Sequence, residues 1–195
     1  MTGPILLLRH GETEWNRQRR YQGGSDSPLT ERGIAQARAI GRFLGILPEA
    51  QDARVVASPL GRARRTAEIL IEHFPTASGL QLDGRLRELS LGSWDGLTYQ
   101  EITDRCPGVF DGPGRYEWYF RSPDGERYDA LAARLAQWLR ECSPEHSLIV
   151  VTHGIVTRVL RGLYAGLPRE LALTLPVPQG RIFRLFEGSI EELAG

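Results

Sequence analysis

Short apolar runs alternate along the chain with longer stretches of helical periodicity. Residues 5–8, 54–57, 147–151 and 181–186 predict β-strands. The first run has no alternation of polar and apolar positions, which is typical of a strand covered on both faces of its sheet. The last run, 181–186, is expected to lie at an edge of the sheet.

Four stretches place apolar residues three and four positions apart and predict helices. The first follows Thr30, a residue type that often caps helices, and is expected to end at Pro48. The second begins after Ser58-Pro59, the third spans about 128–139, and the fourth spans about 155–165.

This order of strands and helices predicts the fold class. Alternating elements favour a three-layer α/β/α sandwich around a mostly parallel sheet. No repeat, linker or low-complexity tract divides residues 1–195, so we expect one domain. Residues of about 84–123 are irregular and rich in glycine and aromatic side chains, and are expected to form a lid-like segment.

Composition narrows the function classes. The formal net charge is zero, which argues against a dedicated nucleic-acid-binding protein. All 24 basic side chains are arginine, so lysine-dependent Schiff bases and Walker-type phosphate loops are excluded. Two widely spaced cysteines predict neither a zinc site nor a disulfide framework, and the short apolar start predicts no membrane span. We therefore expect a cytoplasmic protein.

Histidines and arginines follow the predicted strands. Arg9 and His10 come after the first strand, Arg62 opens the helix after the second, and His153 follows the third. Because ligands bind beyond the carboxyl ends of parallel strands, these side chains are expected to meet. Backbone amides and the helix dipole around Arg62 would also favour an anion there. By contrast, His73 and His146 are expected to be surface residues.

This set of residue types suits transfer of a phosphoryl group. A neutral imidazole, His10, could attack phosphorus through one nitrogen while a hydrogen bond holds the other. Arginine is well shaped to bind phosphate oxygens, and His153 and Asn16 could donate further hydrogen bonds. Glu88 is the candidate proton donor to the leaving group, kept protonated by partial burial.

Several motifs together resemble the histidine phosphatase superfamily, also called the phosphoglycerate mutase-like family. They span nearly the whole chain, and their combination is highly specific. They are Leu8-Arg9-His10-Gly11-Glu12-Thr13 with Trp15-Asn16, Asp26 to Gly33, Ser58-Pro59-Leu60-Gly61-Arg62-Ala63, Arg87-Glu88-Leu89, Gly92-Ser93-Trp94-Asp95-Gly96 and Thr152-His153-Gly154.

The resemblance implies a phosphoglycerate mutase-like fold and a phosphohistidine at His10, with no metal and no cofactor. It implies Glu88 as proton donor and a phosphate pocket formed by Arg9, Asn16, Arg62 and His153. Gln22 and Gly23 match the loop that borders substrate. The residues before and after Glu88 are more like the phosphatase branch, and similar family members are often homodimers.

The favoured function is hydrolysis of phosphate monoesters of small metabolites. A phosphoglycerate mutase activity is the alternative and needs cationic ligands for a carboxylate. A non-catalytic module that binds phosphorylated ligands is a second alternative. Residues 176–180 depart from the family pattern before the last strand. The arginines available to a mutase are Arg17, Arg19, Arg20, Arg115, Arg121 and Arg127.

Overall fold

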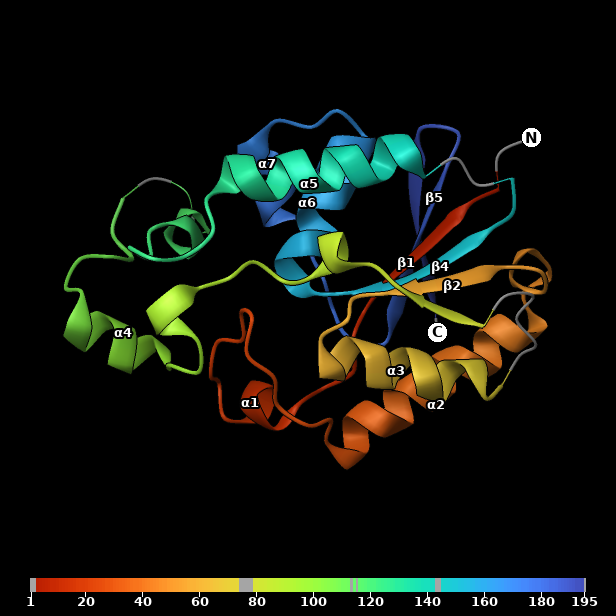
Figure 1. Cartoon of the computed structure of the whole chain (residues 1–195), viewed down its shortest axis with the longest axis horizontal. Coiled ribbons are helices and arrows are strands. Elements are labelled where there is room, and N and C mark those ends of the chain that lie inside the picture. Colours follow the sequence, from red (N-terminus) through yellow and green to blue (C-terminus); the bar gives the residue numbers. More distant parts are fainter. Residues whose placement is uncertain (1–2, 74–78, 113, 115, 143–144, 195) are drawn as a thin grey trace.

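One six-stranded sheet runs through the computed structural model, which describes residues 3–73, 79–112, 114, 116–142 and 145–194. The strand order is β3-β2-β4-β1-β5-β6 (Figure 1). The first four strands of that order are parallel, whereas β5 is antiparallel to β1 and to β6. The strands are β1 (Ile5–Arg9), β2 (Arg54–Ala57), β3 (Leu80–Leu82), β4 (Leu148–Thr152), β5 (Arg181–Phe186) and β6 (Ser189–Ala194).

Helices cover both faces of this sheet, which confirms the predicted three-layer α/β/α fold. Helices α2 and α3 lie on one face and α5, α6 and α7 on the other, while α1 and α4 lie toward one end of the molecule (Figure 1). The helices are α1 (Glu14–Arg17), α2 (Glu31–Ile46), α3 (Gly61–Ile71), α4 (Tyr99–Arg105), α5 (Tyr128–Glu141), α6 (Gly154–Tyr164) and α7 (Arg169–Thr174).

The position of strand β1 between two apolar clusters explains why its sequence does not alternate polar and apolar residues. Leu6 and Leu8 belong to the apolar cluster with α2 and α3, whereas Ile5 and Leu7 belong to the cluster with α5 and α6. All four side chains are buried, so both faces of the strand require apolar residues. The central strands are thereby fixed, and with them the residues that follow their carboxyl ends.

The first predicted helix begins and ends as expected. The Thr30 hydroxyl accepts a hydrogen bond from the Gly33 amide at 3.0 Å, and α2 ends at Ile46, before Pro48. This cap places the first turn of α2 against the loop that follows β1.

The prediction that 181–186 forms an edge strand was wrong. Strand β5 pairs with β1 on one side and with β6 on the other. Glu187 and Gly188, both with positive φ (47° and 76°), form the two-residue turn between β5 and β6. The sequence of β6 hid it, because Glu191 and Glu192 interrupt its apolar positions.

The irregular segment of about 84–123 contains helix α4 and several 3₁₀ turns. Its residues 113 and 115 lie outside the described part of the chain. Trp94, Trp118 and Phe120 are buried in the core, so these aromatic side chains anchor the segment. Helices α1, α4 and α7 were not predicted, because each is too short to show a clear period.

No helix in the described ranges combines the length and apolar character that crossing a membrane requires.

Candidate active site

The carboxyl ends of β1, β2 and β4 bring three distant segments together. The His10 amide donates to the Thr152 carbonyl at 2.9 Å, and the Ser58 amide donates to the Val151 carbonyl at 3.0 Å. As a result the His10 and His153 rings lie with their centroids 5.3 Å apart. The convergence expected from strand direction is present.

His10 is buried and held by one ring nitrogen. Its Nδ1 lies 2.8 Å from the Gly11 carbonyl oxygen, to which it donates, and this leaves Nε2 with a lone pair. Nε2 accepts from Nε of Arg62 at 3.3 Å. Burial, together with Arg9 and Arg62, holds the pKa of His10 well below its usual range. The ring is therefore neutral, with Nε2 available as a nucleophile.

Arg62 is buried at the start of α3 and fixed from several sides. Its terminal nitrogens donate to the carbonyl oxygens of Ser25 at 2.7 Å and Gly23 at 2.9 Å. The Asp26 carboxylate accepts from the same guanidinium at 2.8 Å. These contacts leave Nε facing His10.

The backbone amides and the helix dipole around Arg62 were expected to favour an anion, and the structure places the Asp26 carboxylate there. The amides of Gly61 and Arg62 donate to this carboxylate. Asp26 is thus the anion at the start of α3, where Leu60 supplies no side-chain cap. Arg62 contributes its side chain to the site, not its backbone.

Arg9 is half-buried and lines the same cavity as His10. Its Nε is buried and has no hydrogen-bond partner within the described part of the chain. Its terminal nitrogen makes a long contact of 3.4 Å with the Val177 carbonyl. Burial lowers the pKa of this guanidinium. Arg9 therefore retains donors for a phosphate oxygen.

His153 is fully buried and its ring is bound at Nε2, which lies 2.7 Å from the Ser58 hydroxyl. Its Nδ1 is buried and has no partner among the described residues. Burial, then Arg62, His10 and Arg9, keep the pKa of His153 well below its usual range. His153 thus presents a neutral ring beside the nucleophile.

Asn16 is oriented by two donors. Its Oδ1 accepts from the Thr13 amide at 3.2 Å and from Nε2 of Gln179 at 2.9 Å. Since a backbone amide can only donate, the oxygen of Asn16 must face Thr13, and its NH₂ group is left for another partner. Sequence reasoning missed Gln179, which lies 163 residues away from Asn16.

The two residues expected to border substrate lie at different depths. Gln22 lines the cavity and donates to the Thr13 hydroxyl at 2.6 Å. Gly23 is buried behind Arg62, and a Cβ there would stand 2.1 Å from the Asp95 carboxylate. Gly23 contributes its carbonyl to Arg62 and lies outside the set of lining residues.

Glu88 lies at the start of α6. One carboxylate oxygen accepts from the amides of Leu89 at 3.0 Å and Val156 at 3.3 Å, and the other accepts from Ile155 at 3.2 Å. These three amide bonds hold the carboxyl group of Glu88 at the cavity that His10 and Arg9 also line.

Two glycines press the loop after β1 against α2. A Cβ on Gly11 would stand 2.4 Å from the Gly33 carbonyl oxygen, and one on Gly33 would stand 2.0 Å from the Glu12 carbonyl oxygen. The two backbones are thus in direct contact beside His10.

A cavity of about 160 Å³ opens onto His10. Tyr116, Tyr119 and Arg158 line it and were not predicted as site residues. The Arg158 guanidinium stacks 4.0 Å from the centre of the Tyr116 ring. Arg158 falls one helical turn after Gly154, on the helix that follows the second histidine, and this spacing could have indicated it.

Residues 175–180, which we call the strap, contribute Val177 to the lining of the cavity. Three consecutive carbonyls of the strap each accept from a different arginine: Leu175 from Arg158 at 2.8 Å, Pro176 from Arg161, and Val177 from Arg9. The segment that departs from the family pattern is therefore fixed to the site.

The arginines considered for a mutase mostly face elsewhere. Arg20 lines the cavity and pairs with Glu101 at 2.9 Å. Arg121 and Arg127 bind backbone carbonyls of their own segment, and Arg17 pairs with Glu14. Arg19 is exposed and is not among the lining residues, and the candidate Arg115 lies outside the described residues.

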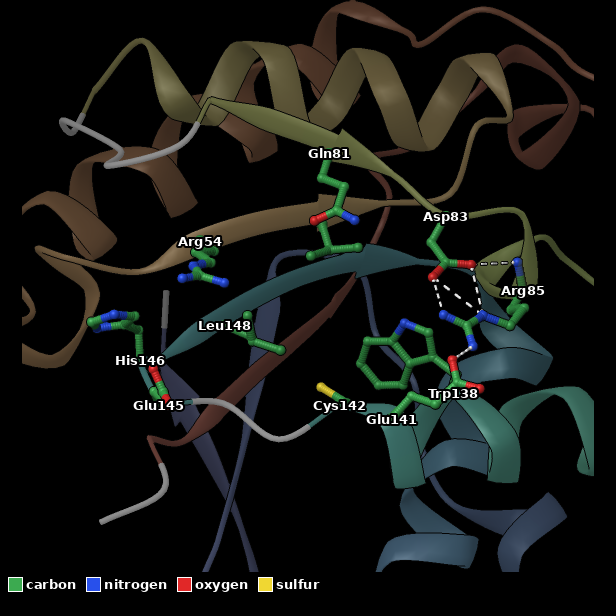
Figure 2. Close-up of a pocket in the computed structure, with 11 residues that line it drawn as sticks. Arg54, Gln81, Asp83, Arg85, Trp138, Glu141, Cys142, Glu145, His146 and Leu148 are labelled. Atoms are coloured by element: carbon green, nitrogen blue, oxygen red, sulfur yellow. Dashed lines mark hydrogen bonds and ion pairs between the residues drawn. The ribbon is translucent and has the colours of Figure 1, made fainter.

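A second cavity of about 410 Å³ lies near β3 and the end of α5 (Figure 2). Within it, Arg85 pairs with both Asp83 and Glu141, so the one cationic group of this trio is bound by the two carboxylates (Figure 2). None of the site residues expected from the sequence lines it. In the described ranges, no group of three or more His, Cys, Asp or Glu side chains is placed to hold a metal ion.

Comparison with known proteins places this geometry in a family. The family model of the histidine phosphatase superfamily (branch 1) matches residues 5–187. A relative from Erwinia tasmaniensis named "Probable phosphoglycerate mutase GpmB" is 41% identical over 175 residues, covering 84% of this chain and 75% of its own.

Two solved structures are similar. A mycobacterial glucosyl-3-phosphoglycerate phosphatase, solved with VO3, is 31% identical with a TM-score of 0.79, covering 98% of this chain and 96% of its own. A phosphoglycerate mutase from Bacillus anthracis has a TM-score of 0.80 at 19% identity, covering 98% and 92%, and shares the fold. The chain therefore belongs to the histidine phosphatase superfamily, branch 1.

Proposed function

We propose that this protein is a metal-independent phosphatase that hydrolyses phosphate monoesters of small metabolites through a phosphohistidine at His10. One observation carries the proposal: a buried, neutral His10 has Nδ1 bound to a carbonyl and Nε2 directed at a pocket of cationic donors. A binding module needs neither the free nucleophile nor a carboxylate beside it. We also keep the cytoplasm as the proposed compartment, which suits the free thiols of Cys106 and Cys142.

In the first step Nε2 of His10 attacks phosphorus, the N–P bond forms, and the bond to the leaving oxygen breaks. Arg62 exchanges its contact with Nε2 for a phosphate oxygen, and Arg9 uses its unpartnered Nε in the same way. Asn16 and His153 supply neutral donors. Fixed donors of this kind stabilise the charge that spreads over the oxygens in the transition state.

Glu88 handles the proton in both steps. In the first step the carboxyl group of Glu88 gives its proton to the leaving oxygen as the bond from that oxygen to phosphorus breaks. In the second step the resulting carboxylate takes a proton from water as the water attacks phosphorus. The N–P bond breaks, phosphate leaves, and His10 is regenerated. Such a general acid is worth roughly a hundred- to ten-thousand-fold in rate.

Phosphoglycerate mutase activity is the second candidate, favoured by the names of relatives about 40% identical. A mutase must keep its intermediate from water and return the phosphoryl group to a second hydroxyl. Arg158 and Arg20 are the cavity arginines that could hold the carboxylate of such a substrate.

The test is phosphate release from para-nitrophenyl phosphate and a panel including 3-phosphoglycerate, in chelator, with His10→Ala as control. Chelator-resistant release that the substitution abolishes supports the phosphatase. Isomerisation of 3-phosphoglycerate with a bisphosphoglycerate primer, without release, supports the mutase. Absence of both activities supports the non-catalytic module that binds phosphorylated ligands.

Glu88→Gln tests the proton donor separately. It should slow substrates with poor leaving groups more than those with good ones, since only the former need the proton in the transition state. Equal losses for both would contradict this role.

A further inference from the structure

The hydrogen bond between His153 and Ser58 determines which ring nitrogen carries the proton. Both residues have no solvent exposure, and Nε2 of His153 lies 2.7 Å from the Ser58 hydroxyl oxygen. A neutral imidazole has a single N–H, so the partner at one nitrogen decides the state of the other.

The Ser58 hydroxyl has one proton to donate and can accept two hydrogen bonds. Its hydroxyl oxygen already accepts from the Leu60 amide at 3.3 Å. Within the described part of the chain, Nε2 of His153 is the one acceptor in reach of its hydroxyl proton. With Ser58 as the donor to Nε2, the chain of bonds runs from Leu60 N–H to Ser58 O–H to Nε2, which places the proton of His153 on Nδ1.

Nδ1 is the ring nitrogen without a protein partner among the described residues, and His153 itself lies behind the residues that line the cavity, next to the lining residue Gly154. Nδ1 is buried, in a ring whose centroid lies 5.3 Å from that of His10. With the opposite tautomer a lone pair would face the phosphate oxygens and repel them, and the Ser58 proton would have no acceptor.

We propose that Ser58 is a positioning residue: it fixes His153 as the Nδ1–H tautomer and so presents a neutral N–H donor to the transferred phosphoryl group. The part that concerns phosphate rests on the proposed function. The tautomer itself is a property of the ligand-free protein.

The two histidines then share one tautomer with opposite consequences. In His10 the Nδ1 proton is bound to the Gly11 carbonyl, which frees Nε2 to attack. In His153 the Ser58 hydroxyl is bound to Nε2, which frees the Nδ1 proton to donate. One ring becomes a nucleophile and its neighbour a donor.

Long-range ¹H–¹⁵N correlation spectra of the whole protein test the tautomer directly. The chain has four histidines, and His73→Gln with His146→Gln removes the two exposed ones. In the remaining pair both Nδ1 atoms should be protonated. Ser58→Ala should move the nitrogen signals of His153 toward a mixture of tautomers and leave those of His10 in place.

A matched control is Ser27→Ala, which removes another buried serine whose hydroxyl accepts from the Trp15 amide. It should leave both tautomers unchanged. Protonation of Nε2 in wild-type His153, or unchanged His153 signals in Ser58→Ala, would overturn the proposal. Because no substrate is present, neither result depends on whether the protein is a phosphatase.

Kinetics then test the functional part with the substrate that the wild-type protein hydrolyses. Ser58→Ala should lower kcat/KM roughly tenfold, the scale of one hydrogen bond to a charged group. The same change in a His153→Ala background should have no effect, because Ser58 acts through that ring. An equal loss in both backgrounds would show that Ser58 acts otherwise and refute its positioning role.

Discussion

Asp26 joins the fold to the phosphate pocket, and Asp26→Ala tests that link. Its carboxylate accepts from the amides of Gly61 and Arg62 and from the Arg62 guanidinium. Loss of a helix cap costs about 1 kcal/mol. The ion pair adds about 1 kcal/mol at most, because the Asp26 side chain is 39% exposed and solvent screens it.

The expected loss in the free energy of unfolding is therefore about 2 kcal/mol, which lowers Tm by about 4–8 °C for a chain of this size. Urea and thermal unfolding measure it, with the exposed Asp52→Ala as control. Asp26→Asn should lie between the two, since it keeps one acceptor oxygen and loses the charge.

Asp26→Ala should have a smaller effect on kcat/KM, expressed as free energy, than on the free energy of unfolding. The carbonyls of Gly23 and Ser25 still hold Arg62 in the variant, so kcat/KM should fall less than tenfold. Arg62→Ala should cost roughly a hundredfold or more. An unchanged Tm, or an activity loss in Asp26→Ala as large as in Arg62→Ala, would refute this account.

Three further outcomes are expected. Gln179→Leu should lower kcat/KM about three- to tenfold, because it removes the hydrogen bond that orients Asn16. A double-mutant cycle with Asn16→Ala measures this coupling, and an equal loss from Gln179→Leu in the Asn16→Ala background would contradict the role of Gln179. Stability to urea should fall by about 2 kcal/mol between pH 7 and pH 5.5. The unfolded chain gains protons on His10 and His153 below the usual pKa of 6.5, whereas their folded pKa values lie well below it. Replacing both histidines with glutamine should reduce this pH-dependent loss of stability. An unaltered loss in that variant would contradict its assignment to His10 and His153. Burial raises the pKa of Cys142 to about 11, so iodoacetamide at pH 8 should modify it far more slowly in the native protein than after unfolding. Alkylation of the native thiol at the unfolded rate would disprove this.

The sequence predicted the frame of the site because buried strands carry a strong signal. Apolar runs located β1, β2 and β4, and strand direction then brought Arg9, His10 and His153 together. Their chemistry followed from residue type. These steps use local sequence and one rule about parallel sheets.

The supporting contacts were not predictable in this way. Asp26 reaches α3 across 35 residues, and Gln179 reaches Asn16 across 163. Neither spacing corresponds to the repeat of a helix or a strand, so these two contacts can be recognised only in the folded chain. Strand β6 was not predicted for a different reason: Glu191 and Glu192 interrupt its apolar pattern.

The contact between Gly11 and Gly33 limits how such a site can diversify. Any side chain at either position would force two backbones apart beside His10, at distances of 2.0–2.4 Å. Substitutions that adapt the protein to a new leaving group must therefore arise elsewhere. The strap and the cavity-lining side chains of Tyr116 and Tyr119 have this freedom, because Arg158 holds the strap through a backbone carbonyl and the two tyrosines face the cavity. Selection for new substrates should change these positions and spare the loop that carries the nucleophile.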